Sequence, residues 1–205
     1  MNLNFEAALL NVALLCILTV PHEFAHALVA HLLGDDTPEN EGRLTLYPPA
    51  HIDMIGTVLL PALTSLFGGG LLGWGRPVNT NTARLRWHYN GLALVALAGP
   101  ASNILLAVLF AALSFFTAKV YADLSEFASR AASLSVYLAV FNMIPVPPLD
   151  GSKLLIAARL PVAIYAEIAR FGFVFLIVLM SATNFGYYLS SYSLRITSAI
   201  FGIFY

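Results

Sequence analysis

Charged residues are scarce in this sequence, and their scarcity excludes an ordinary soluble domain. Only 10% of the 205 residues are Asp, Glu, Lys or Arg, whereas about 25% is usual for a soluble globular domain. The net charge is −1, so the chain has no basic excess with which to bind nucleic acid. We therefore expect no nucleic-acid partner.

Cysteine is almost absent as well. Cys16 is the only one, so no internal disulfide can form, and its place in an apolar run indicates a packing role. The N-terminal apolar run lacks the basic residues that begin a cleavable signal peptide, so we expect none. Apolar side chains, in contrast, make up 59% of the chain, and the mean hydropathy is +0.80. These values predict an all-α, multi-pass integral membrane protein with a single domain over residues 1–205.

The apolar runs predict about five to six membrane segments, because a helix of about 20 residues crosses the hydrocarbon core. One run breaks at Pro145–Gly151, where prolines interrupt helical hydrogen bonding. The runs cover residues 5–33, 55–74, 91–120, 131–144 with a continuation to about 160, 171–188, and a short tail at 193–205.

Basic residues predict the orientation in the membrane. If the loop after His26 is cytosolic, seven Lys and Arg residues fall inside and two outside, as the positive-inside rule requires. The inside residues are Arg43, Arg76, Arg84, Arg86, Lys153, Arg159 and Arg170, the outside residues are Lys119 and Arg130, and Arg195 is not assigned to a side. The active site would then face the cytoplasmic side.

This orientation requires residues 52–74 to enter and leave the membrane on the same side. Pro61 and Gly68–Gly70 suit a broken, re-entrant segment, which is tolerated at membrane depth where protein or a watery cavity covers it. The alternative is a true span, which would place the arginines of residues 76–86 outside.

The sequence His22-Glu23-Phe24-Ala25-His26 predicts a metal site. Residues i and i+4 share one face of a helix, so two imidazoles there can bind one zinc ion while the intervening carboxylate reaches the zinc-bound water. Ionisable residues inside a hydrophobic helix are costly and indicate function. The alternative is a helix end at the membrane interface, where His22 and Glu23 would meet lipid headgroups.

A catalytic zinc ion needs a third protein ligand. His31 lies about 140° round the helix from His26 and faces away from it. Asp150 is the better candidate, because it follows the proline break and precedes Gly151, whose conformational freedom permits a tight turn. Asp150 is also a candidate N-cap of a new helix, and the two roles are compatible.

The sequence resembles the site-2 proteases, which cut within or beside transmembrane helices. The resemblance rests on three motifs in the family's order and separation, over about residues 10–160. They are His22–His26, Ala98-Gly99-Pro100-Ala101-Ser102-Asn103, and Asn142-Met143-Ile144-Pro145-Val146-Pro147-Pro148-Leu149-Asp150-Gly151. The segments Gly73-Trp74-Gly75-Arg76-Pro77-Val78 and His51-Ile52-Asp53, the latter followed by Gly56-Thr57, resemble the compact branch that lacks PDZ and CBS domains.

The resemblance implies a zinc metalloendopeptidase with one Zn²⁺ per chain, held by His22, His26 and Asp150, with Glu23 as the catalytic base. It implies a three-helix catalytic core over about residues 10–160, with C-terminal membrane segments at 161–205. It places Asn142 near the zinc and the substrate, although an amide that stabilises the helix beside the proline break is an alternative. Asn103 is expected either to support the site and substrate or to join helices.

The expected partners are a transmembrane protein substrate and the lipid bilayer, in regulated intramembrane proteolysis. A substrate helix has no free backbone groups, so it must unwind, and residues 57–60 or 43–47 are candidates for an extended edge beside which it lies. For Asp53, capping of a helix start is favoured over ion binding. The competing functions are a cation transporter with broken helices and an inactive membrane scaffold.

Overall fold

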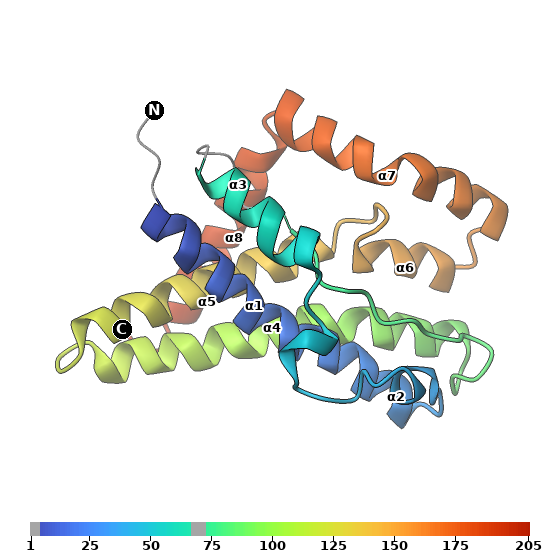
Figure 1. Ribbon diagram of the computed structural model, residues 1–205, viewed down its shortest axis with the longest axis horizontal. Coiled ribbons are helices and arrows are strands. Elements are labelled where there is room, and N and C mark those ends of the chain that lie inside the picture. Colours follow the sequence, from blue (N-terminus) through green and yellow to red (C-terminus); the bar gives the residue numbers. More distant parts are fainter. Residues whose placement is uncertain (1–4, 67–72) are drawn as a thin grey trace.

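The computed structural model describes residues 5–66 and 73–205, and all regular structure in these ranges is helical (Figure 1). This confirms the predicted all-α class. The helices are α1 (Phe5–Leu32), α2 (Thr37–Asn40), the 3₁₀ turn η1 (Pro48–Ala50), the π-helical turn η2 (Met54–Leu59), α3 (Leu60–Leu66), α4 (Tyr89–Thr117), α5 (Ala122–Asn142), α6 (Asp150–Ala157), α7 (Val162–Ala182) and α8 (Phe185–Phe201).

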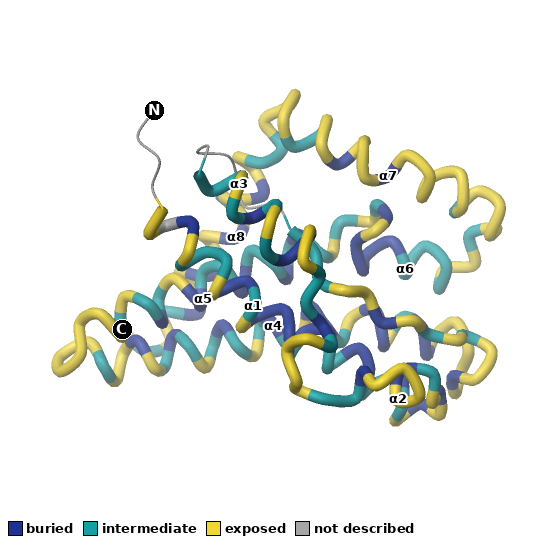
Figure 2. The backbone as a smooth tube through the Cα atoms, in the orientation of Figure 1, coloured by how far each residue is buried: buried dark blue, intermediate teal, exposed yellow. Residues whose placement is uncertain are grey.

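Within the described ranges, three helices are long and apolar enough to cross a membrane. They are Ala8–Leu32 of α1, the whole of α4, and the whole of α7. This agrees with the expected integral membrane protein. The residues of α7 are mostly exposed (Figure 2), as on a surface that faces lipid.

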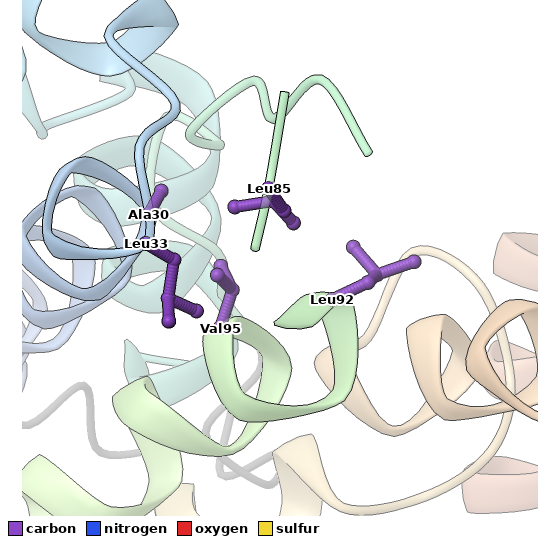
Figure 3. Packing of buried hydrophobic residues seen from close by; sticks show 5 residues of the cluster. All are labelled: Ala30, Leu33, Leu85, Leu92 and Val95. Atoms are coloured by element: carbon purple, nitrogen blue, oxygen red, sulfur yellow. The ribbon is translucent and has the colours of Figure 1, made fainter. Parts of the chain in front are cut away.

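The core forms where α1 crosses the antiparallel pair α4 and α5 (Figure 1). Small residues on α4 and α5, such as Ala107, Ala111 and Ala132, are fully or almost fully buried and let the helices approach closely. A second cluster joins the end of α1, the loop before α4, and the first turns of α4 (Figure 3). Its members are Ala30, Leu33, Leu85, Leu92 and Val95.

Two helices differ in extent from the apolar runs of the sequence. Helix α5 begins at Ala122 rather than at 131, because helical hydrogen bonding continues through its charged first turns, where Glu126 pairs with Arg130. The apolar run at 171–188 is divided between α7 and α8, because Thr183 is extended with φ −131° and ψ 169°. Hydropathy indicates which residues are apolar, and it does not determine where a helix begins or ends.

Residues 73–76 lie beside residues 51–56. Asp53 caps η2 by accepting hydrogen bonds from the backbone N–H groups of Ile55 at 3.0 Å and Gly56 at 2.7 Å, which confirms the capping role. Helix α3 then runs beside α1, where Asn11 donates to Ser65 at 3.1 Å. The returning chain is held by a hydrogen bond of 2.8 Å from Arg76 N–H to the carbonyl of His51. Gly68–Gly70, which the sequence suggested as a turn, lie outside the described residues.

The extended edge predicted at 57–60 was wrong, since those residues are helical. Residues 73–81, which pass beside them, have no regular secondary structure. Their N–H groups at Trp74 and Arg76 donate to Gly56 and His51, at 3.0 and 2.8 Å.

His51 is expected to make the protein less stable as the pH is lowered. Its side chain is fully buried and donates Nε2–H to the carbonyl of Thr45 at 2.6 Å. Burial lowers the pKa of His51, outweighing that hydrogen bond, and the nearby Arg43 lowers it further. The neutral ring therefore stabilises the fold fully above the unfolded-state pKa of about 6.5, and this stability is lost as pH falls from there through the lower folded-state pKa. Thermal unfolding of His51→Gln from about pH 7.5 to 5 should show a shallower pH dependence than the native chain. The exposed His88→Gln is the matched control, and equal slopes for all three proteins would contradict the prediction.

Candidate metal centre

Helix α1 supplies three of the predicted site residues. His22, Glu23 and His26 lie on consecutive turns and are 6%, 8% and 1% exposed. Pro21 lies inside α1 directly before them and does not end the helix. The i, i+4 spacing therefore sets both imidazoles on the same buried face.

Helix α6 supplies Asp150 as its first residue, and this carboxylate is 7% exposed. The chain leaves α5 at Asn142 and passes through the proline-rich segment before α6 begins. Gly151 is needed here for close approach and not for a special turn, since a Cβ on it would overlap the carbonyl oxygen of Met143. The turn brings Asp150 against α1, 124 residues away in sequence from His26.

The three side chains meet in one triangle of atoms. His22 Nε2 and His26 Nε2 are each 3.0 Å from Asp150 Oδ2, and they are 3.1 Å from one another. Hydrogen bonds alone leave this triangle poorly satisfied, because one oxygen is shared and the two nitrogens also face each other. Zinc bonds of about 2.0–2.2 Å to imidazole nitrogen and carboxylate oxygen separate tetrahedral ligands by about 3.3 Å. The donor set and its spacing therefore fit a zinc ion.

The surroundings of the two histidines support this fit. His26 Nδ1–H donates to the carbonyl of Val95 at 2.7 Å, which leaves the Nε2 lone pair free to face Asp150. Gly99 of α4 lies against both rings, because a Cβ built on it would overlap the Nε2 atoms of His26 and His22. His22 Nδ1 has no hydrogen-bond partner in the described part of the chain.

The triangle opens onto a cavity of about 770 Å³. Glu23 lines it and packs against the segment 73–81, since a Cβ on Gly75 would lie 2.9 Å from Glu23 Oε1. The other wall comes from α7, where Phe173 meets Trp74 edge to face at 5.3 Å between ring centroids. The Glu23 carboxylate, the polar triangle and the segment 73–81 thus line one cavity.

Asn103 and Asn142 both line this cavity. Asn103 is 1% exposed, and its Oδ1 has no partner among the described residues. Asn142 Nδ2 donates to the carbonyl of Leu138 in its own helix at 3.0 Å. The structure thus brings both amides to the site, with Asn142 also stabilising the end of α5.

The remaining histidines lie elsewhere. His31 Nδ1 is 3.3 Å from Asp36 and 3.2 Å from Glu39, in an exposed group beyond the end of α1. Lys153 was expected only as a basic residue on the cytosolic side, yet its Nζ is 3.0 Å from Asp150 Oδ1. Its position three residues after Asp150 on a helix was the signal available.

Comparison with known proteins decides the family. The sequence profile of peptidase family M50 matches residues 118–180. The chain is 37% identical over 169 residues to the "Putative zinc metalloprotease YwhC" of Bacillus subtilis (strain 168), which covers 77% of this chain and 74% of that protein. This chain belongs to peptidase family M50, the site-2 protease family. It is therefore a zinc-dependent metalloendopeptidase of the site-2 protease type, integral to the membrane.

Two proteins named "Putative zinc metalloprotease Rip2" are further relatives of this M50 chain. Identity is 36% over 134 residues to Rip2 of Mycolicibacterium smegmatis, covering 63% of this chain and 49% of that protein. Identity is 35% over 168 residues to Rip2 of Mycobacterium tuberculosis (strain ATCC 25618 / H37Rv), covering 78% and 62%. The chain thus spans about half to three fifths of the Rip2 proteins. No solved structure matches it significantly.

Proposed function

We propose that this M50 peptidase hydrolyses peptide bonds within or next to transmembrane segments of membrane proteins, as a step of regulated intramembrane proteolysis. One observation carries the proposal: three candidate ligand atoms lie within 3.1 Å of one another beside Glu23 and face a cavity. Two of them belong to α1, which is long enough to cross the membrane. His22 and His26 lie about 15 and 9 Å along α1 from Leu32, at about 1.5 Å per residue. A peptide bond cut here would be inside or at the edge of the bilayer.

One zinc ion per chain would be held by His22, His26 and Asp150. Bound there, it would supply Lewis-acid activation of water and of the scissile carbonyl group. Glu23 then accepts the proton of the attacking water and passes it to the leaving amine. Asn142 and Asn103 contribute amide groups to the same cavity and orient substrate backbone or developing negative charge.

Residues 52–74 form a re-entrant segment in this proposal. The hydrogen bond from Arg76 to His51 supports it, because the two ends of a true span would be about 30 Å apart. The return brings Arg84 and Arg86 to the C-terminal end of α1, where Arg86 N–H donates to the carbonyl of Leu33 at 2.7 Å. With the positive-inside rule, this end faces the cytoplasm, and so does the metal site.

The domain and segment counts follow from this topology. The whole chain acts as a single protease domain, with a core over about residues 10–160 and the hairpin α7–α8 as C-terminal membrane segments. Counting α1, the re-entrant segment, α4, α5, α7 and α8 gives six segments. The unwound substrate lies along residues 73–81, which have no regular secondary structure and pass beside Glu23 at Gly75.

The experiment combines metal analysis with cleavage. The chain, purified in detergent, is expected to contain about one zinc per molecule and to cut a generic transmembrane substrate. A chelator should abolish cleavage, and added zinc should restore it. His26→Ala should lose zinc and activity, because only two ligands remain, while the exposed His88→Ala should keep both. A purified native chain without zinc, or cleavage that survives in His26→Ala, would overturn the proposal.

A further inference from the structure

The carboxylate of Asp150 is divided between two different neighbours. Its Oδ2 atom faces His22 Nε2 and His26 Nε2, each at 3.0 Å. Its Oδ1 atom accepts a hydrogen bond from Lys153 Nζ, also at 3.0 Å. Oδ2 therefore faces the candidate metal centre, and Oδ1 binds an ammonium group.

The position of Lys153 lets it keep Oδ1 of Asp150 apart from Oδ2. It lies one turn after Asp150 on α6, so both side chains share a face of the helix. Its side chain is 24% exposed and lines the cavity together with Glu23 and Tyr165. Among the described residues that line the cavity, it is the only Lys or Arg. No other ion pair of Lys153 occurs in the described part of the chain.

We propose that Lys153 is a positioning residue that confines Asp150 to metal binding through Oδ2 alone. The inference rests on the proposed function, in which Asp150 is a zinc ligand. A carboxylate can bind a metal through one oxygen or both, and the second oxygen would occupy the coordination position that a catalytic zinc site leaves to water. The ammonium group of Lys153 holds Oδ1 away from that position. It also fixes the rotation of the carboxylate, as hydrogen bonds to ligand side chains do in zinc sites.

Lys153→Met tests the role, because Met retains the apolar stem and removes the ammonium group. Zinc affinity is expected to fall by about 10–100-fold, the range found when such ligand partners are removed, so zinc should be lost faster to an excess of chelator than in the native chain. In the cobalt-substituted protein, the visible absorption of a four-coordinate ion is expected to weaken as Oδ1 becomes a fifth ligand. The kcat should fall with KM nearly unchanged, since Lys153 is assigned to the ligand and not to substrate.

Two variants complete the design. Lys153→Arg keeps a cation near Oδ1 and should recover most of the chelation resistance and the cobalt spectrum. Lys119→Met, at the exposed connection between α4 and α5, is the matched control and should behave as native. If Lys153→Met does not fold, the rates of zinc loss from Lys153→Arg and Lys153→Gln are compared instead. Arg retains the positive charge and Gln does not.

The outcomes separate this inference from the proposed function. If the native chain holds no zinc, the proposed function fails. If the native chain holds zinc and Lys153→Met loses it at the native rate with an unchanged cobalt spectrum, the positioning role is overturned. A fall in kcat with native zinc kinetics would also overturn it, because the lysine would then act on substrate directly.

Discussion

Glu23→Gln is expected to lower kcat by about 10²–10⁴-fold, the contribution usual for a general base, while zinc stays bound. The amide has almost the same shape as the carboxylate and cannot accept the proton of water. The metal ligands are separate residues, so zinc content should remain that of the native chain. Cleavage of a transmembrane substrate and zinc per chain, measured on the same preparation, check both halves of the prediction.

Glu6→Gln is the matched control for this substitution. Glu6 lies in the exposed first turn of the same helix and makes the same change of charge. It should cleave at the native rate. Activity of Glu23→Gln within about threefold of native would remove Glu23 from the role of base, whatever its zinc content.

Gly99→Ala is expected to displace zinc and to lower cleavage by at least the 10–100-fold that follows when the support of metal ligands is disturbed. A Cβ at this position would overlap Nε2 of both His22 and His26. The atoms in the way are the two proposed ligand atoms, so relief requires the rings to move off the triangle. Zinc affinity by competition with a chelator is the direct measurement.

The control for Gly99→Ala is Gly186→Ala, also in a helix. A Cβ there meets Met180 Cε at 3.4 Å, which is ordinary contact, and alanine is favoured over glycine in a helix by about 1 kcal/mol. This variant should keep its zinc and unfold at the same or a higher temperature. Native zinc affinity in Gly99→Ala would mean that the packing of α4 against the histidines does not shape the metal site.

Local patterns in the sequence predicted the local parts of the site. The i, i+4 spacing of His22 and His26 determines their shared helix face. His31 was expected to face away from that site, and it contacts Asp36 and Glu39 instead. Asp53 was expected to cap a helix, and it does. The roles of His22, Glu23, His26 and Asp150 remain predictions that only chemistry can test.

Contacts between distant segments could not be predicted in the same way. The approach of Gly75 to Glu23 joins residues far apart in the chain, and no periodicity records it. The helical form of residues 57–60 defeated the expectation of an edge there, since short apolar runs do not distinguish strand from helix. Lys153 resembled an ordinary basic residue on the cytosolic side until its distance to Asp150 was known.

The central claim is that zinc is bound by two histidines and one carboxylate. Zinc X-ray absorption of the purified chain tests it most directly. We expect two imidazole nitrogens and two oxygens, from Asp150 and water, at about 2.0–2.2 Å. A sulfur ligand at about 2.3 Å, or a spectrum unchanged when Asp150 is replaced by Ala, would contradict the account.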